Sequence, residues 1–62
     1  MKEEYIEYFT HMQEEHIRLP LSGMAWDDVY WWIYNAIEKD KCFTKEELAK
    51  MFPVLLGHLV KS

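Results

Sequence analysis

Apolar residues recur at helical spacing over residues 2 to about 17. Tyr5, Phe9, Met12, His16 and Leu19 follow one another at intervals of four, three, four and three residues, which stacks them on one face of a helix. The opposite face carries glutamates, namely Glu3, Glu4, Glu7, Glu14 and Glu15. The pattern therefore predicts an amphipathic helix with an acidic outer face.

A second helix is predicted over residues 24 to about 39, after a connector that covers residues 18–23. Pro20 in this connector does not easily continue a helix, and Ser22 is well placed to cap the start of the next one. The positions expected to face the core of the protein are Ala25, Trp26, Val29, Ile33, Ala36 and Ile37.

The start of a third helix is marked by the sequence Thr-Lys-Glu-Glu at residues 44–47. Thr44 can accept a hydrogen bond from the amide of Glu47, and the Glu47 carboxylate can reach back to the amide of Thr44. Phe43 and Leu48 occupy the positions of the hydrophobic staple that often accompanies such a capping box.

Pro53 leaves two descriptions of this third helix open. In one, the helix ends at Phe52 and a short fourth helix begins with Pro53 in its first turn. In the other, the helix continues through a kink at the proline. The sequence favours the kinked, continuous helix, because one helical register runs across the proline through Leu48, Phe52, Leu55 and Leu59.

These segments predict an all-α fold, a three-helix bundle with a kinked or split third helix, in a single domain over residues 1–62. A chain of this length buries only about 60% of the surface that its unfolded form exposes. Cys42 is the only cysteine, so no internal disulfide can add stability. The predicted core consists of Phe9, Met12, His16, Trp26, Val29, Ile33, Ala36, Leu48, Phe52, Leu55 and Leu59.

Residues 30–34, Tyr-Trp-Trp-Ile-Tyr, carry more apolar surface than one face of a helix can bury. Each residue turns the helix by about 100°, so five consecutive side chains cannot all enter one small core. Trp31 lies one turn from Asp27 and from Asn35, inside the polar face, and Tyr34 is its neighbour. Either the connector or the C-terminal tail covers this pair, or the pair makes an intermolecular contact. The predicted contact surface comprises Tyr30, Trp31, Tyr34, Asp27, Asp28, Asn35 and Glu38, which resembles the aromatic centre and polar rim of protein interfaces.

Charge is divided unevenly between the two halves of the chain. Residues 1–31 hold two basic residues against seven acids, whereas residues 32–62 hold five lysines against four acids, and the net charge is −4. An acidic first half argues against direct binding to nucleic acid or to anionic membranes. It suits a basic protein partner, toward which the glutamates of the first helix could steer association.

Candidate chemistry is sparse. His11 and His16 are five residues apart, whereas two zinc ligands on one helix need a spacing of about four. The thiol of Cys42 has no oriented base beside it in the sequence, which a cysteine nucleophile would need. We therefore expect no catalytic residues, no bound metal and no cofactor, and we do not expect an enzyme.

The cellular setting is expected to be the cytoplasm. A lone thiol suits a reducing compartment, and no signal-peptide pattern follows Met1. No apolar run approaches the roughly 20 residues of a transmembrane helix, so we expect no membrane segment.

Two motif resemblances bear on binding. Residues 38–48 resemble the end of an EF-hand loop running into its exit helix, but the central glycine is missing and Cys42 and Thr44 hold ligand positions. Residues 27–62 look like a helix-turn-helix unit, but the stretch that would read DNA offers only His58 and Lys61 for contacts to bases or phosphates. The first likeness predicts no calcium site, and the second leaves a DNA-binding regulator as the weakest alternative, with its basic surface around Lys50.

The sequence favours a non-enzymatic protein-binding module, acting as an inhibitor or adaptor of a larger protein complex. In general character the chain resembles the small acidic helical proteins with which phages and mobile elements inhibit a host enzyme or defence complex. A homo-oligomeric structural protein, such as a homodimer, is the first alternative, because self-contact would also cover exposed aromatic residues.

Overall fold

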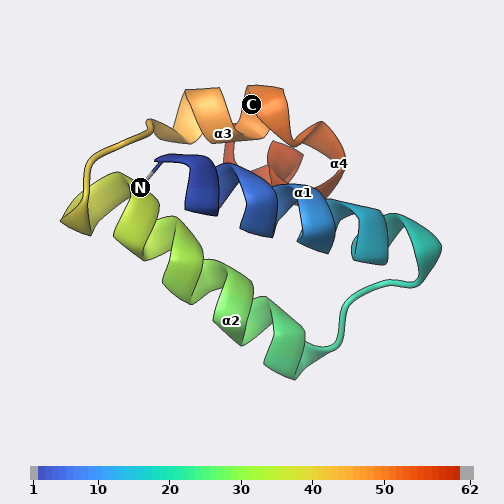
Figure 1. Cartoon of the computed structure of the whole chain (residues 1–62). Coiled ribbons are helices and arrows are strands. Elements are labelled where there is room, and N and C mark those ends of the chain that lie inside the picture. Colours follow the sequence, from blue (N-terminus) through green and yellow to red (C-terminus); the bar gives the residue numbers. More distant parts are fainter. Residues whose placement is uncertain (1, 61–62) are drawn as a thin grey trace.

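Figure 1 shows how the helices of the computed structural model, which describes residues 2–60, are arranged around one another. α1 and α2 run in roughly opposite directions and diverge toward the connector that joins them, and α4 packs against α1. The elements are α1 (Lys2–Arg18), α2 (Gly23–Tyr34), the π-helical turn η1 (Asn35–Lys39), α3 (Lys45–Met51), α4 (Pro53–Leu56) and the 3₁₀ turn η2 (Gly57–Val60). No strand occurs in residues 2–60, so the predicted all-α fold is confirmed.

Both predicted helix starts are present. The hydroxyl of Ser22 accepts a hydrogen bond from the amide of Ala25 at 3.2 Å. At α3, the hydroxyl of Thr44 accepts from the amide of Glu47 at 3.1 Å, and the Glu47 carboxylate accepts from the amide of Thr44 at 2.9 Å. Each cap satisfies amide groups that have no partner within their own helix.

The expectation of a continuous third helix was wrong. Phe52 has φ −128° and ψ 65°, which is not helical, so α3 ends before it and α4 begins at Pro53. The proline ring disfavours helical geometry in the residue before it, whereas proline fits the first position of a new helix. The side-chain oxygen of Gln13 accepts from the amides of Val54 and Leu55 at 3.0 and 3.2 Å, which caps α4 from α1.

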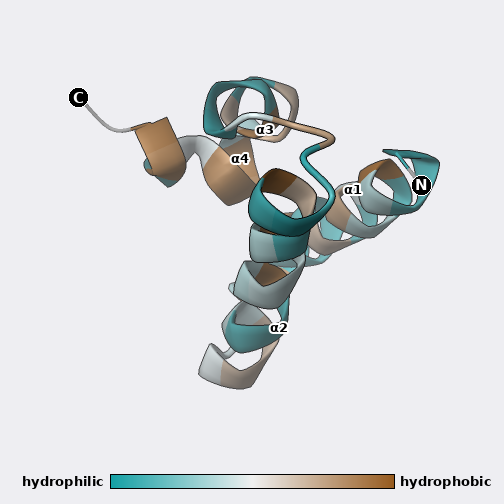
Figure 2. Ribbon diagram, turned by 90° about the vertical axis from the view of Figure 1, so that its left-hand side faces the viewer, coloured by the Kyte–Doolittle hydropathy of each residue, from teal (hydrophilic) through white to brown (hydrophobic). Residues whose placement is uncertain are grey.

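The core is built from α1, α2, η1, α3 and α4, together with Phe43 from the connector before α3. Figure 2 shows α4 as strongly hydrophobic, in keeping with its two buried leucines. The buried apolar residues are Tyr5, Phe9, Val29, Ile33, Ala36, Phe43, Leu48, Ala49, Phe52, Leu55 and Leu56. Seven of the predicted core residues are among them, namely Phe9, Val29, Ile33, Ala36, Leu48, Phe52 and Leu55.

Four predicted core residues, Met12, His16, Trp26 and Leu59, are only half-buried. His16 lies in the last turn of α1 and Trp26 in the first turn of α2, close to the connector, toward which the two helices diverge (Figure 1). The break at Phe52 also restarts the helical register, which helps explain why Leu56 is fully buried and Leu59 is not.

The end of the second helical segment widens into the π-helical turn η1. The amide of Asp40 donates to the carbonyl of Asn35 at 2.8 Å, which is one residue farther back than in an α-helix. Lys41 then takes a left-handed conformation with φ 53°, and the amide of Cys42 returns to the carbonyl of Ala36 at 2.9 Å. This turn brings Asp40 beside the hydroxyl of Tyr5 in α1.

Candidate functional site

The face of α2 that points away from the core is largely uncovered. We call it the outer face, and it consists of the exposed residues Met24, Asp27, Asp28, Trp31, Tyr34 and the following Glu38. Trp31 is 54% exposed and Tyr34 is 58% exposed, and neither makes a ring contact with another aromatic residue in the described chain. Neither the connector nor any other described segment covers most of these two residues.

Polar groups surround the two exposed rings as the sequence predicts. Asp27 lies one turn before Trp31, and Glu38 lies one turn after Tyr34 on the same side of the helix. Asn35 is half-buried, and its side-chain amide donates to the backbone carbonyl of Trp31 at 2.7 Å. This hydrogen bond fixes the position of Asn35 next to Trp31.

Tyr30, the third aromatic residue of the predicted contact surface, also packs within the protein. Its ring lies 5.6 Å from that of Trp26, and its hydroxyl lies 3.2 Å from Nε2 of His58. Tyr30 lies one turn before Tyr34 and about 100° around the helix from Trp31, and it links α2 to the C-terminal turn η2. It therefore contributes to packing between elements, with about half of its surface still exposed.

An aromatic contact between α1 and α2 lies beside the outer face, and the sequence alone did not reveal it. The rings of Tyr8 and Trp32 stack with centroids 4.0 Å apart and an interplanar angle of 5°. Tyr5 meets Trp32 edge to face at 5.7 Å. The hydroxyl of Tyr8 donates to Asp28 at 2.6 Å, and the hydroxyl of Tyr5 donates to Asp40.

The neighbouring carboxylates affect the ionisation of both tyrosines. The hydrogen bond to Asp40, together with burial, raises the pKa of Tyr5 to about 12. Burial, together with the hydrogen bond to Asp28, raises the pKa of Tyr8 above its ordinary value. Both phenols therefore stay neutral to a higher pH than an ordinary tyrosine does. Each hydroxyl also holds a carboxylate at the edge of the aromatic contact.

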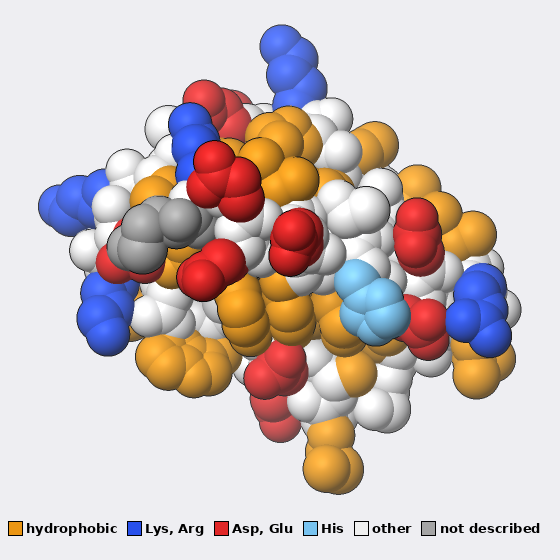
Figure 3. Space-filling model, viewed as in Figure 1, with side chains coloured by type: hydrophobic (Ala, Val, Ile, Leu, Met, Phe, Trp, Pro, Cys, Tyr) orange, Lys and Arg blue, Asp and Glu red, His pale blue; other side chains and the backbone are white. Residues whose placement is uncertain are grey.

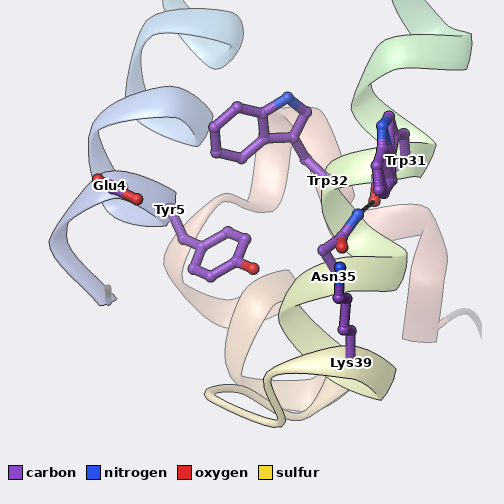
Figure 4. Close-up of a pocket in the computed structure, with 6 residues that line it drawn as sticks. All are labelled: Glu4, Tyr5, Trp31, Trp32, Asn35 and Lys39. Atoms are coloured by element: carbon purple, nitrogen blue, oxygen red, sulfur yellow. Dashed lines mark hydrogen bonds between the residues drawn. The ribbon is translucent and has the colours of Figure 1, made fainter.

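A hollow of about 350 Å³ opens where this aromatic contact meets the outer face. Figure 4 shows Trp31, Asn35 and Lys39 in line along the second helical segment, with the ring of Trp32 reaching from it toward Tyr5 of α1. We call this hollow the aromatic cleft, and its lining residues are Glu4, Tyr5, Trp31, Trp32, Asn35 and Lys39.

The predicted acidic face of α1 is exposed. Glu3, Glu4, Glu7 and Glu14 are exposed, and the half-buried Glu15 pairs with Arg18 at 3.0 Å. Figure 3 shows acidic side chains gathered over α1, apolar side chains between α1 and α2, and basic side chains mainly at the rim of this view. Glu4 of this acidic face and Trp31 of the outer face line the same hollow, the aromatic cleft.

The remaining candidate groups, His16 and Cys42, make contacts within the fold. Nδ1 of the half-buried His16 accepts a hydrogen bond from the amide of Leu21 at 3.2 Å, and its ring meets Trp26 edge to face. The Cys42 thiol is half-buried and lies 3.8 Å from the carbonyl oxygen of Asp40. Within residues 2–60, no group of three or more His, Cys, Asp or Glu side chains is arranged to hold a metal ion. None of the described helices is both long and apolar enough to cross a membrane.

The segment that resembles a recognition helix does not form one long helix. It is divided between α4, which has four residues, and the 3₁₀ turn η2. Leu55 and Leu56 on it are buried, and His58 is exposed but lies beside Tyr30. Lys61, the second basic residue of this segment, lies outside the described residues.

No known protein family, curated protein or solved structure matches this chain. Relationships to other proteins therefore assign no function to the outer face or to the aromatic cleft. The features that bear on function are the exposure, charge and geometry of these two neighbouring surfaces.

Proposed function

We propose that this chain is a non-enzymatic protein-binding module that docks through the outer face of α2. The observation that supports the proposal is the exposure of Trp31 and Tyr34, more than half of each side chain, on a helix whose opposite face is buried. Folding gives no reason to place two large aromatic rings in water, because their burial elsewhere would stabilise the chain. A partner that covers them would recover this free energy.

The residue types of the outer face suit such a role. Tryptophan and tyrosine are enriched among the residues that dominate binding energy, because they bury a large area and lose little rotamer entropy. Asp27, Asp28 and Glu38 around the rings are exposed, as the polar rim of an interface is. The wider acidic surface of α1 favours a partner with basic residues around an apolar patch.

A module of this kind would act by masking or bridging its partner, as an inhibitor or an adaptor of a larger complex. Self-association is the second candidate, and Met24 is the observation that favours it. Met24 is 84% exposed and lies seven residues before Trp31, so it extends the apolar surface along two turns of α2. Two copies of such a strip could pack against each other about a two-fold axis.

The test compares the whole chain with the variant Trp31→Ala. Immobilised wild-type protein is used to capture partners from the source cells, and binding of the purified partner is then measured with both proteins. We expect Trp31→Ala to weaken binding by at least about 2 kcal/mol while changing protomer stability by less than about 0.5 kcal/mol. Light scattering after size-exclusion chromatography measures self-association with the same two proteins.

The matched control is Val54→Ala. Val54 is also 54% exposed but lies on α4, away from the outer face, so its truncation should leave binding unchanged. A Trp31→Ala protein that unfolds more easily by several kcal/mol, with partner binding intact, would contradict the proposal. The proposal would also be contradicted if the wild-type protein is monomeric and if the wild type and Trp31→Ala capture the same proteins from the source cells.

A further inference from the structure

Three aromatic residues and three polar residues line the aromatic cleft, and this combination points to one class of ligand. Tyr5 is 7% exposed, and its ring meets that of Trp32 edge to face. Trp31 rises beside them from the outer face (Figure 4). Aromatic rings present negative faces, which attract cations placed over them.

Charges around the cleft favour a cation as well. Glu4 lines the cleft from α1, Asp40 holds the hydroxyl of Tyr5, and Asp28 holds the hydroxyl of Tyr8, whose ring stacks on Trp32. Three carboxylates, of which only that of Glu4 lines the cleft, therefore lie around the rings of Tyr5, Trp32 and Tyr8. Two ammonium groups lie nearby: that of Lys39 lines the cleft, and that of Lys2 lies 5.1 Å from the ring centroid of Phe43, which meets Tyr5 edge to face. The raised pKa values of Tyr5 and Tyr8 agree with this negative surrounding.

Asn35 supplies an acceptor on the α2 side of the cleft. Its Nδ2 donates to the carbonyl oxygen of Trp31, and since a carbonyl can only accept, this bond fixes the orientation of the amide. Oδ1 of Asn35 therefore remains an acceptor, and no described residue donates to it. The cleft then offers aromatic faces together with acceptors on both helices, Glu4 on α1 and Asn35 in η1.

We propose that the aromatic cleft binds an arginine side chain of the partner protein. A guanidinium group is planar, stacks on tryptophan and carries donors on several edges, so it can reach Glu4 and Asn35 while it lies on a ring. A lysine ammonium is a more compact and more strongly hydrated charge, which fits this arrangement less well. Lys39 opposes the cation and so limits affinity. The inference rests on the proposed docking surface and names the chemistry of the partner's anchoring residue.

The test uses N-acetyl-arginine amide as the probe and the isotope-labelled whole chain as the receptor. Nuclear magnetic resonance follows the indole N–H signals of Trp26, Trp31 and Trp32 and the side-chain amide of Asn35 during titration. We expect saturable shifts at Trp31, Trp32 and Asn35 but not at Trp26. The lysine analogue should bind at least about three-fold more weakly than the arginine probe, and the uncharged citrulline analogue should give no saturable shift.

Charge variants make the assignment specific. Glu4→Gln should weaken binding of the arginine probe about three-fold, and Lys39→Gln should strengthen it by a similar factor, since each removes one charge beside the site. Glu46→Gln is the matched control, because Glu46 is an exposed acid of α3 that does not line the cleft. Thermal unfolding of each variant shows whether the fold is retained.

The inference is overturned if the arginine probe gives no saturable shift, if citrulline amide gives the same shifts, or if Glu4→Gln and Glu46→Gln weaken binding equally. These results are separate from the test of docking. Loss of partner binding in Trp31→Ala, with no probe binding in wild type, would keep the docking surface and reject the arginine site. Probe binding in wild type, with partner binding intact in Trp31→Ala, would keep the arginine site and reject the docking surface.

Discussion

The two faces of α2 both carry large apolar residues, but their surroundings differ. On the inner face, Val29 and Ile33 are at most 8% exposed and belong to the core cluster. On the outer face, Met24, Trp31 and Tyr34 are all more than half exposed. The inner face accounts for why α2 folds onto the rest of the chain. The outer face adds apolar surface that the fold does not use.

The size of the core explains why the second face stays outside. Only a small volume is available in a chain of this length, and Phe9, Leu48, Leu55, Leu56 and Val29 fill it without exposure. A helix with large apolar residues on every side can be fully buried only in a larger core or by another chain. In this chain Trp31 and Tyr34 therefore face solvent.

The largest expected effect on stability is at the inner face. Ile33→Ala should lower the free energy of unfolding by about 2–5 kcal/mol, because it leaves a cavity among packed side chains. Urea unfolding of Ile33→Ala and Trp31→Ala under the same conditions makes the comparison directly. If self-association occurs, the measurement is repeated over a range of protein concentrations. Equal losses of stability in the two variants would abolish the distinction between the faces.

A second prediction concerns the edge of the inner face, where Tyr5 touches Trp32 and Phe43. The fold raises the pKa of Tyr5 to about 12 from an ordinary value of 10.0, so the neutral phenol is favoured in the folded state. This contribution to stability is complete below pH 10 and is lost as the pH rises from about 10 through 12.

This loss is measured by denaturant unfolding from about pH 9 to about pH 12, the range in which tyrosine ionises. Tyr5→Phe cannot ionise, so its stability should decline less steeply over that window than that of the wild type. Tyr8, whose pKa is also raised, should account for part of the remaining slope. Parallel pH curves for the wild type and Tyr5→Phe would mean that the Tyr5–Asp40 hydrogen bond does not persist in solution.

A smaller loss is expected where a helix end, rather than a face, is changed. Thr44→Ala removes the hydroxyl that caps α3 and should cost about 1 kcal/mol of stability. Thr44→Ser keeps the hydroxyl and should recover most of this loss. An unchanged urea midpoint in Thr44→Ala would show that the capping box contributes nothing to the fold. The result also sets a scale against which the small stability change expected for Trp31→Ala can be judged.

Local signals in the sequence were sufficient for the helix starts and for most of the core. The caps at Ser22 and Thr44 depend on residues close in sequence, and such short-range chemistry can be predicted without the fold. The break at Pro53 was mispredicted because a continuous apolar register was given more weight than the backbone restriction on Phe52. Gln13, which caps the start of α4, is more than forty residues away from it in the chain, so no local pattern indicates this cap.

The candidate site was predictable only in part, for a similar reason. The exposure of Trp31 and Tyr34 follows from the periodicity of one helix, which the sequence contains. The aromatic cleft depends on how α1 and α2 cross, because Glu4 and Tyr5 meet Trp31 and Asn35 only in three dimensions. Tyr30, which the sequence also places in the contact surface, is about half exposed, and its contact with the distant His58 follows only from the fold.

The smallest expected effect concerns the rate of association, and its sign distinguishes the two kinds of partner. The exposed acidic residues of α1, including Glu7 and Glu14, should attract a basic partner at long range. Raising the ionic strength from about 0.05 M to about 0.5 M shortens the screening distance severalfold, so association with a basic partner should slow by a few fold. Dissociation, which depends on the packing of Trp31, should change less.

Self-association should respond to salt in the opposite direction. Two copies that each carry a net charge of −4 repel one another, so added salt should speed their association. The double variant Glu7→Gln with Glu14→Gln should reduce either salt effect, whereas Glu46→Gln on α3 should change it less, because Glu46 lies on another element. Stopped-flow association rates measured across this salt range provide the test. A rate that does not change with salt in either reaction would leave the acidic face of α1 without a role in binding, while the aromatic outer face would still be tested by Trp31→Ala.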